Sequence, residues 1–143
     1  MKTFKDGGIH PPEMKQLSKD SKLERIELPK QLIFPVSQHI GAPAKAIVSV
    51  GDEVLKGQVI AEANGFVSVP IHASTSGKVV TIEPRTTVLG KICDHIVIES
   101  DGQDKWSEEN KRSREWKDLG KDKIKSFIKD AGIVGMGGVA FPT

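Results

Sequence analysis

The feature that most restricts the fold of this chain is the alternation of short apolar runs with turn pairs over residues 44–84. This stretch reads AKAIVSVGDEVLKGQVIAEANGFVSVPIHASTSGKVVTIEP. The pairs are Gly51-Asp52, Lys56-Gly57, Asn64-Gly65 and Ser76-Gly77. Each contains a glycine, which can take a positive φ without steric cost. Strands separated by turns this closely are too short for a wide open sheet. They favour a small closed or sandwiched barrel.

Three strands can be placed within and just after this stretch. Asn64-Gly65 is the strongest hairpin signal in the chain. Beyond it, residues 67–71 alternate between apolar and other residues with a period of two, which predicts a half-buried strand. Residues 78–82 and 95–99 supply two more strands. The fold class predicted from these patterns is mainly β.

Composition excludes several classes of protein. The chain has 143 residues, 37% of them hydrophobic, and a formal net charge of +2, so no clustered basic face points to a nucleic-acid partner. No apolar run approaches the roughly 20 residues that cross a bilayer, and no signal-peptide core is visible at the N-terminus. The single cysteine, Cys93, excludes an internal disulfide or a multi-cysteine metal cage within these residues. We expect a cytoplasmic, non-membrane-spanning protein.

Four regions can be distinguished along the chain. Residues 1–30 are polar and contain Pro11-Pro12, which predicts an extended arm that either lies against the following domain or is a disordered segment. Residues 31–100 form the barrel. Residues 101–123 are dominated by charges and predict a linker, with one helical turn near 108–116 and with Trp106 and Trp116 as anchors to a neighbouring surface. Residues 124–143 begin another unit.

An amphipathic helix opens this last unit. Ile124, Phe127, Ile128 and Ala131 follow the i, i+3, i+4, i+7 spacing of one helix face. Gly132 is placed to end the helix in the left-handed conformation.

The barrel resembles the biotinyl/lipoyl carrier fold, a barrel-sandwich hybrid. The likeness lies in VSVGDEVLKGQVIAEA and VSVPIHASTSGKV. Carriers of this kind present a modified lysine at a hairpin tip, but the matching position here is Phe66, which has no amine to carry lipoate or biotin. We therefore interpret the barrel as a structural or docking module.

The histidines and the cysteine show no catalytic or metal-binding pattern. His10, His39, His72 and His95 lack metal-ligand spacing and are best explained as surface or turn residues. One alternative stays open: small phosphocarrier barrels pass phosphate between converging histidines, and His39 and His72 could converge. Cys93 is best explained as a structural thiol. No catalytic residue and no metal ligand is predicted.

A glycine-rich loop follows the helix. Gly135, Gly137 and Gly138, with Val139 and Ala140 after them, satisfy the loose pattern G-x-G-x-x-[GA]. The context argues against a Rossmann site, because a dinucleotide fingerprint follows a strand and opens a helix. Consecutive backbone N–H groups here could form an anion-binding nest. From mechanics alone, an anion site and a plain tail are equally open.

Three segments in order resemble one family, the RnfC family of the Rnf electron-transport complex. They are GGIHPPEMK, the barrel from LPKQLIFPV to TIEPR, and AGIVGMGGVAFPT. The last segment is also similar to the Gly-Gly-Ala-Gly-Phe-Pro-Thr segment in the NADH-oxidising subunit of respiratory complex I. Val139 and Ala140 stand where that relative has Ala and Gly.

The resemblance implies a peripheral subunit of a membrane-bound oxidoreductase. The complex would move electrons between ferredoxin and NAD, coupled to Na⁺ or H⁺ transport. The subunit would carry FMN, an NADH site and two 4Fe-4S clusters on the cytoplasmic side of the plasma membrane, beside membrane-embedded sibling subunits. Gly135, Gly137 and Gly138 match the loop that contacts FMN or nucleotide phosphates.

The cluster-binding cysteine motifs of that family are absent from these 143 residues. We therefore expect the chain to be the N-terminal portion of a longer subunit. Alone, it should be inactive and bind neither FMN nor NADH, because a flavin pocket needs many converging contacts. The alternatives are a carrier or phosphocarrier barrel and a non-catalytic interaction barrel.

Overall fold

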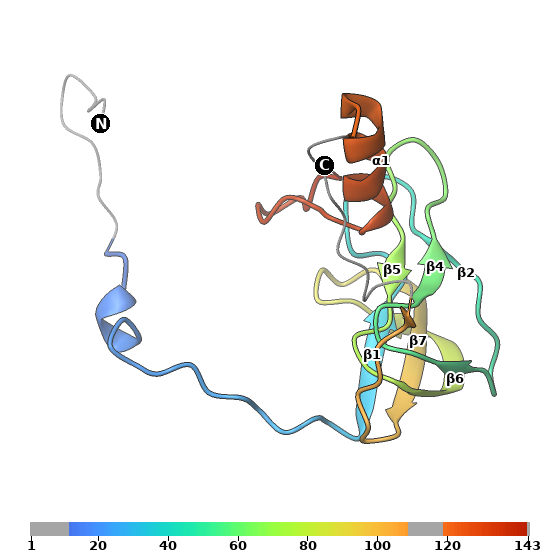
Figure 1. Cartoon of the computed structure of the whole chain (residues 1–143), viewed down its shortest axis with the longest axis horizontal. Coiled ribbons are helices and arrows are strands. Elements are labelled where there is room, and N and C mark those ends of the chain that lie inside the picture. The colour runs from blue at the N-terminus through green and yellow to red at the C-terminus, as the bar shows by residue number, and fades with distance from the viewer. Residues whose placement is uncertain (1–11, 109–118, 143) are drawn as a thin grey trace.

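The computed structural model describes residues 12–108 and 119–142, which form two small antiparallel sheets and one α-helix (Figure 1). The four-stranded sheet has the order β1-β7-β6-β3 and the three-stranded sheet the order β2-β4-β5. The strands of the first sheet are β1 (Gln31–Pro35), β7 (Ile92–Ser100), β6 (Gly77–Thr86) and β3 (Glu53–Val54). Those of the second are β2 (Lys45–Ala46), β4 (Val59–Glu62) and β5 (Ile71–His72). The mainly β, barrel-sandwich prediction is confirmed.

The β6–β7 hairpin supplies the two central strands of the first sheet. Its pairing runs from Gly77↔Ser100 to Thr86↔Ile92, with a register shift between Val79 and Thr81. A bulge of this kind bends a hairpin and increases its twist, which curls the sheet. The predicted strands at 78–82 and 95–99 lie inside β6 and β7, but the two strands are longer than expected.

The second sheet contains the hairpin predicted at Asn64-Gly65, in which β4 pairs with β5. The strand predicted over 67–71 is wrong except at its end, because residues 63–70 form a loop. Within this loop, the Ser68 hydroxyl accepts the Asn64 N–H at 3.0 Å, and the Val69 N–H is donated to His39 Nε2 at 3.3 Å. These hydrogen bonds to side chains take the place of the backbone hydrogen bonds of a strand. Ser68 and Val69 are both buried, so the loop does not show the alternating burial of a half-buried strand.

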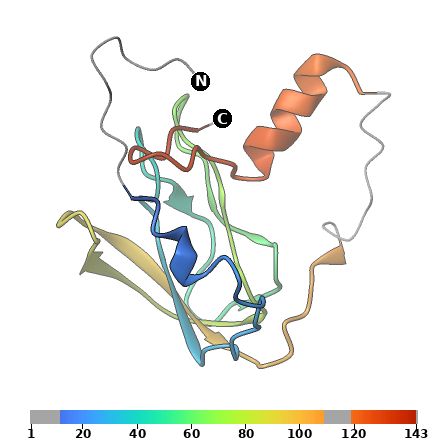
Figure 2. The ribbon, with the colours of Figure 1, turned by 90° about the vertical axis from the view of Figure 1, so that its left-hand side faces the viewer.

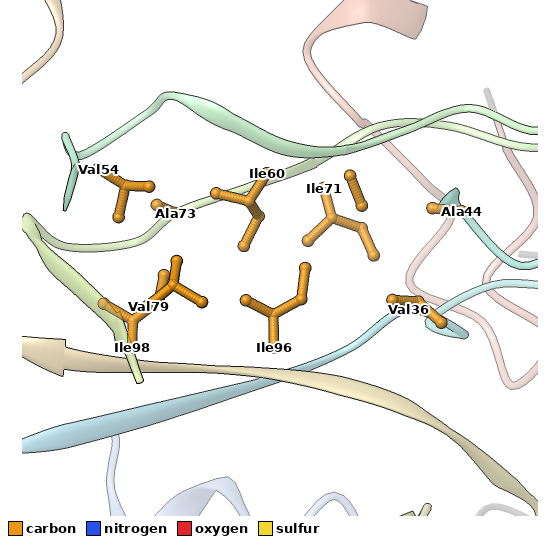
Figure 3. Packing of buried hydrophobic residues seen from close by; sticks show 10 residues of the cluster. Val36, Ala44, Val54, Ile60, Ile71, Ala73, Val79, Ile96 and Ile98 are labelled. Carbon is orange, nitrogen blue, oxygen red and sulfur yellow. The ribbon is translucent and has the colours of Figure 1, made fainter. Parts of the chain in front are cut away.

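The core lies between the two sheets. Figure 3 shows Ile60 and Ile71 of the second sheet facing Ile96 and Val79 of the first. Ile60 and Ile96 are fully buried. Burial of such side chains is the main favourable term in folding a barrel of this size.

The turn predicted at Ser76-Gly77 is wrong for Gly77. It has no positive φ and is instead the first residue of β6. A Cβ built at this position would lie 2.0 Å from the Glu99 carbonyl oxygen on β7. Close approach of two strands, and not a turn conformation, is therefore why glycine is required here. The glycines of the other three pairs do have positive φ.

The described part of the N-terminal arm does not lie against the barrel, contrary to the first of the two alternatives predicted. Residues 12–30 are exposed throughout, contain only the short 3₁₀ helix η1 (Lys15–Leu17), and lead away from the sheets (Figure 1). The apolar side chains of the arm are left uncovered among the described residues: Met14, Leu17, Leu23, Ile26 and Leu28 are all exposed.

The start of the predicted charged linker is attached to the barrel. The Lys56 N–H donates to the Lys105 carbonyl at 2.8 Å, and the Ser107 N–H donates to the Lys56 carbonyl at 2.9 Å. Lys56 Nζ pairs with Asp104 Oδ2 at 2.5 Å and lies 5.0 Å from the Trp106 ring centroid. Trp106 thus contacts the barrel itself. The helical turn expected near 108–116 and Trp116 lie almost wholly outside the described residues. The division of the chain into four regions stays a prediction.

The predicted amphipathic helix is present as α1 (Lys121–Asp130). Ile124, Phe127 and Ile128 are half-buried, as the spacing indicated. Lys129 is half-buried as well, and Ala131, the fourth residue of the predicted face, is exposed just after the helix. Gly132 follows with a φ of 69°, the left-handed conformation expected of it.

Candidate functional site

The glycine-rich loop folds back on itself directly after α1. The Gly135 N–H donates to the Phe141 carbonyl at 2.7 Å, and the Ala140 N–H donates to the Gly137 carbonyl at 3.0 Å. Val134 forms an antiparallel bridge with Pro142. These contacts make residues 134–142 a closed loop with its tip at residues 136–139.

Three contacts attach this loop and α1 to the barrel. The Ile40 N–H donates to the Val139 carbonyl at 3.0 Å. Gly132 packs so closely on the loop between β4 and β5 that an added Cβ would lie 2.5 Å from the Pro70 carbonyl oxygen. His72 makes a hydrogen bond with the backbone of Asp130 at the end of α1. Figure 2 shows the loop (red) lying across one end of the barrel.

The tip of the loop has backbone N–H groups that are available to donate hydrogen bonds. In the part of the chain that the structure describes, no acceptor is found for the N–H groups of residues 136–139. Gly137 and Gly138 have neither a positive φ nor any neighbouring atom within 4 Å of an added Cβ. Nothing among the described residues therefore requires glycine at these two positions. Bare amides without Cβ atoms are suited to the close approach of an anion or a planar ligand.

His72 links β5 to α1, and its partial burial changes the pKa of its ring. Desolvation lowers the pKa of His72 from its ordinary value of 6.5, and the backbone hydrogen bond with Asp130 opposes this shift. Because the folded-state pKa is the lower one, the unfolded chain binds the proton more readily. The stability that His72 contributes is present above pH 6.5 and is lost as the pH falls below that value.

The lowered pKa of His72 gives a test of the contact between β5 and α1. We expect the free energy of unfolding of the chain to decrease between pH 7 and pH 5.5, and the decrease to be smaller in His72→Gln. Urea denaturation of both proteins at the two pH values measures the difference. An equal pH dependence in wild type and variant would show that the neutral His72 ring is not what stabilises this contact.

His39 and His95 have structural environments. His39 is buried; its Nδ1 donates to the Ile40 carbonyl at 2.8 Å, and its Nε2 accepts the Val69 N–H. With both nitrogens occupied, His39 is not free to accept a phosphoryl group. His95 is also buried, with Nδ1 2.8 Å from the Cys93 carbonyl oxygen. These two histidines were expected to be surface or turn residues; His39 is buried but does lie in a bend, whereas His95 is buried within β7 and fits neither description.

The phosphocarrier alternative is not favoured, because both ring nitrogens of His39, one member of its histidine pair, are already bonded to backbone groups. His10 lies outside the described residues. Cys93 is a half-buried free thiol on β7 that packs against the core, which agrees with a structural role.

The hairpin tip between β4 and β5 carries Phe66, which is 96% exposed. This is the tip position at which a carrier domain would present its lysine. The structure therefore places an inert aromatic ring there, as the likeness to carriers indicated.

A groove beside the glycine-rich loop was not predicted. It has a volume of about 770 Å³ and lies between three segments that are far apart in sequence. They are the end of β1 with the loop after it (residues 33–40), the tip of the β6–β7 hairpin (86–91), and residues 138–140 of the glycine-rich loop. One sequence signal could have indicated it: Val88 and Leu89 occupy a hairpin tip, where polar turn residues are usual.

Two kinds of site are not found in residues 12–108 and 119–142. No group of three or more His, Cys, Asp or Glu side chains could hold a metal ion. Within the same ranges, no helix has the length and apolar character needed to cross a bilayer.

Comparison with known proteins identifies the family to which the barrel belongs. The family model for the RnfC barrel sandwich hybrid domain matches residues 2–103. The chain is 48% identical over 143 residues to the C subunit of the proton-translocating ferredoxin:NAD(+) oxidoreductase complex of Clostridium ljungdahlii, covering 99% of this chain and 31% of the relative. It is also 48% identical over 141 residues to the C subunit of the Na(+)-translocating complex of Acetobacterium woodii, covering 99% of this chain and 32% of the relative.

A more distant relative gives the same result. The C subunit of the ion-translocating oxidoreductase complex of Pectobacterium atrosepticum is 42% identical over 142 residues, which is 96% of this chain and 20% of the relative. The chain thus spans about a third or less of the length of these relatives. With its curled sheets, its inert hairpin tip and the family match over residues 2–103, the chain belongs to the RnfC family and contains that family's N-terminal barrel-sandwich hybrid domain.

Proposed function

We propose that this chain is the N-terminal portion of the RnfC subunit of an Rnf-type complex, which passes electrons between ferredoxin and NAD and couples this to ion translocation. In this function the barrel is a positioning module. It holds α1 and the glycine-rich loop in place, and the loop contributes backbone contacts to a flavin or nucleotide.

The observation that carries this proposal is the geometry of the loop tip. The loop is closed at its base by the Val134–Pro142 bridge, and its tip residue Val139 is held to the barrel by the hydrogen bond from the Ile40 N–H. Its tip nevertheless exposes amides and two glycines for which the described residues give no structural reason. A rigid loop with exposed amide donors is what close binding of a phosphate or a flavin edge needs.

The residues present fit FMN or a nucleotide and do not fit an iron–sulfur cluster. Gly137 and Gly138 are the proposed contacts through backbone N–H groups and close approach, and Gly135, whose N–H is already donated to the Phe141 carbonyl, would contribute close approach alone. A 4Fe-4S cluster requires four thiolates, and Cys93 is the only cysteine in the 143 residues. The two clusters expected for the family would therefore be held by the part of the subunit that follows residue 143. When bound, FMN would supply the exchange between hydride and single-electron transfer.

The partners and location follow from the same assignment. We propose contacts with the other subunits of the complex, including membrane-embedded ones, and a peripheral position on the cytoplasmic side of the plasma membrane. NADH would bind the complete subunit. The described barrel and loop alone provide too few contacts to enclose a flavin, so we expect the 143-residue chain to bind neither FMN nor NADH measurably.

Single methyl groups at the loop tip test the cofactor contact. In the full-length subunit, Gly137→Ala and Gly138→Ala should each weaken FMN or NADH binding by about fivefold or more, because an overpacked contact costs about 1–3 kcal/mol. Gly120→Ala, before α1 and also without neighbours, is the matched control and should change binding little. Fluorescence titration of FMN and NADH against each purified protein measures the dissociation constants.

Two outcomes would contradict the proposal. Unchanged affinity for both FMN and NADH in the two tip variants would remove the loop from the cofactor site. Saturable quenching of FMN by the 143-residue chain alone would contradict the expectation that the loop needs the rest of the subunit.

A further inference from the structure

The groove beside the glycine-rich loop is an apolar face that the barrel leaves uncovered. Its large apolar side chains are all at least partly exposed: Ile33, Ile40, Val88, Leu89 and Val139. We call this set the apolar face. Val88 is 102% exposed and Leu89 78%, values that show side chains pointing fully into solvent. A contiguous apolar surface of this kind is typical of a protein contact site.

The hairpin tip that carries Val88 and Leu89 has an ordered backbone. The Thr87 N–H donates to the Lys91 carbonyl at 2.7 Å, and the Gly90 N–H donates to the Thr87 carbonyl at 2.9 Å. Figure 2 shows this hairpin (yellow) projecting from the barrel. The exposure of the two side chains therefore results from a defined turn. A preformed tip loses little conformational entropy when it is covered.

The charges around the groove favour an apolar occupant. Among the described residues that line it, Lys91 is the only lysine, arginine, aspartate or glutamate. His39 and His95 also line it, but each has a ring nitrogen bonded to backbone. A strongly charged partner surface would lose hydration here without gaining ion pairs. The complementary surface is one of aliphatic or aromatic side chains.

The course of the chain indicates where that surface comes from. Val139 and Ala140 form one wall of the groove, and Pro142, two residues later, is held by its bridge to Val134. Whatever polypeptide follows residue 143 thus begins beside the groove. The curated relatives are about three times as long as this chain or longer, since the chain covers 31% of the Clostridium relative and 32% of the Acetobacterium one.

The N-terminal arm is a poorer candidate. It enters β1 at Gln31, whereas Pro35, at the other end of that strand, lines the groove. Figure 1 shows the described arm leading away from the barrel.

We infer that in the full-length subunit the apolar face is covered by the polypeptide that follows Thr143, through apolar side chains packed between the β6–β7 tip and the glycine-rich loop. This inference rests on the proposed function only in that such a polypeptide follows. The contact would fix the following domain against the barrel. It would also hold the glycine-rich loop between the two, so that the barrel sets the position of the loop.

Cysteine accessibility in the full-length subunit, purified without its sibling subunits, tests the inference. Leu89→Cys reports on the groove, and Val50→Cys, at a turn outside the groove and 61% exposed, is the matched control. Each variant is alkylated with a maleimide, folded and in urea, and the rate is read from its peptide by mass spectrometry. Trypsin cleavage after Lys91 separates position 89 from the native Cys93.

We expect folding to slow the reaction at Leu89→Cys by about tenfold or more and at Val50→Cys by no more than about twofold, because only a covered site must open before it reacts. Equal rates at the two positions would overturn the inference. So would equal slowing at both, which would mean cover that is not specific to the groove. Protection of position 89 only after sibling subunits are added would assign the face to another chain and overturn it as well.

A charge at the same place gives an independent readout. Leu89→Asp should lower the Tm of the full-length subunit and leave the Tm of the 143-residue chain unchanged, since the side chain is solvent-exposed in the latter. An unchanged Tm in both would count against the inference. FMN and NADH titration of the same wild-type preparation tests the proposed function separately. Protection at position 89 without cofactor binding would refute the proposed function and leave this inference standing.

Discussion

Ile96→Ala should destabilise the 143-residue chain by about 3 kcal/mol, within the range of about 2–5 kcal/mol measured for truncation of buried isoleucines and leucines. Ile96 has no solvent-exposed surface and lies on β7, the strand that pairs with both β1 and β6. Its side chain meets the second sheet (Figure 3), so its loss leaves a cavity between the sheets. Guanidinium denaturation followed by tryptophan fluorescence measures the change.

The matched control lies on the same strand. Ile92 is 74% exposed, so Ile92→Ala removes the same atoms without opening a cavity. We expect a change within about 0.5 kcal/mol for this variant. Comparable losses at positions 92 and 96 would mean that the two sheets do not enclose the core described here.

Gly77→Ala is the second substitution with a large expected effect. The added Cβ would lie 2.0 Å from the Glu99 carbonyl oxygen and 2.9 Å from the Glu99 carbonyl carbon, both of which are backbone atoms. Neither can rotate away, so β6 and β7 must separate where their pairing begins. We expect a loss of about 3 kcal/mol or more, at the upper end of the cost of overpacking.

Gly137→Ala is the control for this substitution. It adds the same methyl group where no atom lies within 4 Å and where φ is not positive. The free energy of unfolding of the 143-residue chain should stay the same or rise by up to about 1 kcal/mol, because the unfolded chain loses entropy. Wild-type stability in Gly77→Ala would show that the two strands tolerate a wider spacing. Gly137→Ala thus separates two roles: it should leave folding intact and still weaken cofactor binding in the full-length subunit.

The signals that could be interpreted correctly from the sequence are those that depend on neighbouring residues. The positive φ of Gly51, Gly57 and Gly65 follows from turn chemistry. The presence of α1 and the left-handed Gly132 shortly after its end follow from a 3.6-residue period and the conformational freedom of glycine. The family could be identified because its three motifs stand in the expected order. The assignment of Gly135, Gly137 and Gly138 to a cofactor remains a proposal.

The errors arose where distant residues compete with the local pattern. Val67, Ser68 and Val69 alternate like a strand, but His39 and Ala42 provide hydrogen-bond partners from another loop and keep this backbone out of the sheet. Gly77 looked like a turn residue because the position of Glu99, more than twenty residues later, cannot be known from the local sequence.

The sequence by itself determined the glycine turns at Gly51, Gly57 and Gly65 and the helix, because each depends on conformational preferences within a few residues. It indicated the kind of barrel through a resemblance to a known fold. The tertiary structure decided which glycines face a neighbouring strand and which face open space. It also decided that segments near residues 35, 89 and 139 would enclose one groove. The physical reason is that close packing and cavities are properties of atoms brought together from distant parts of the chain, so no local pattern can encode them alone.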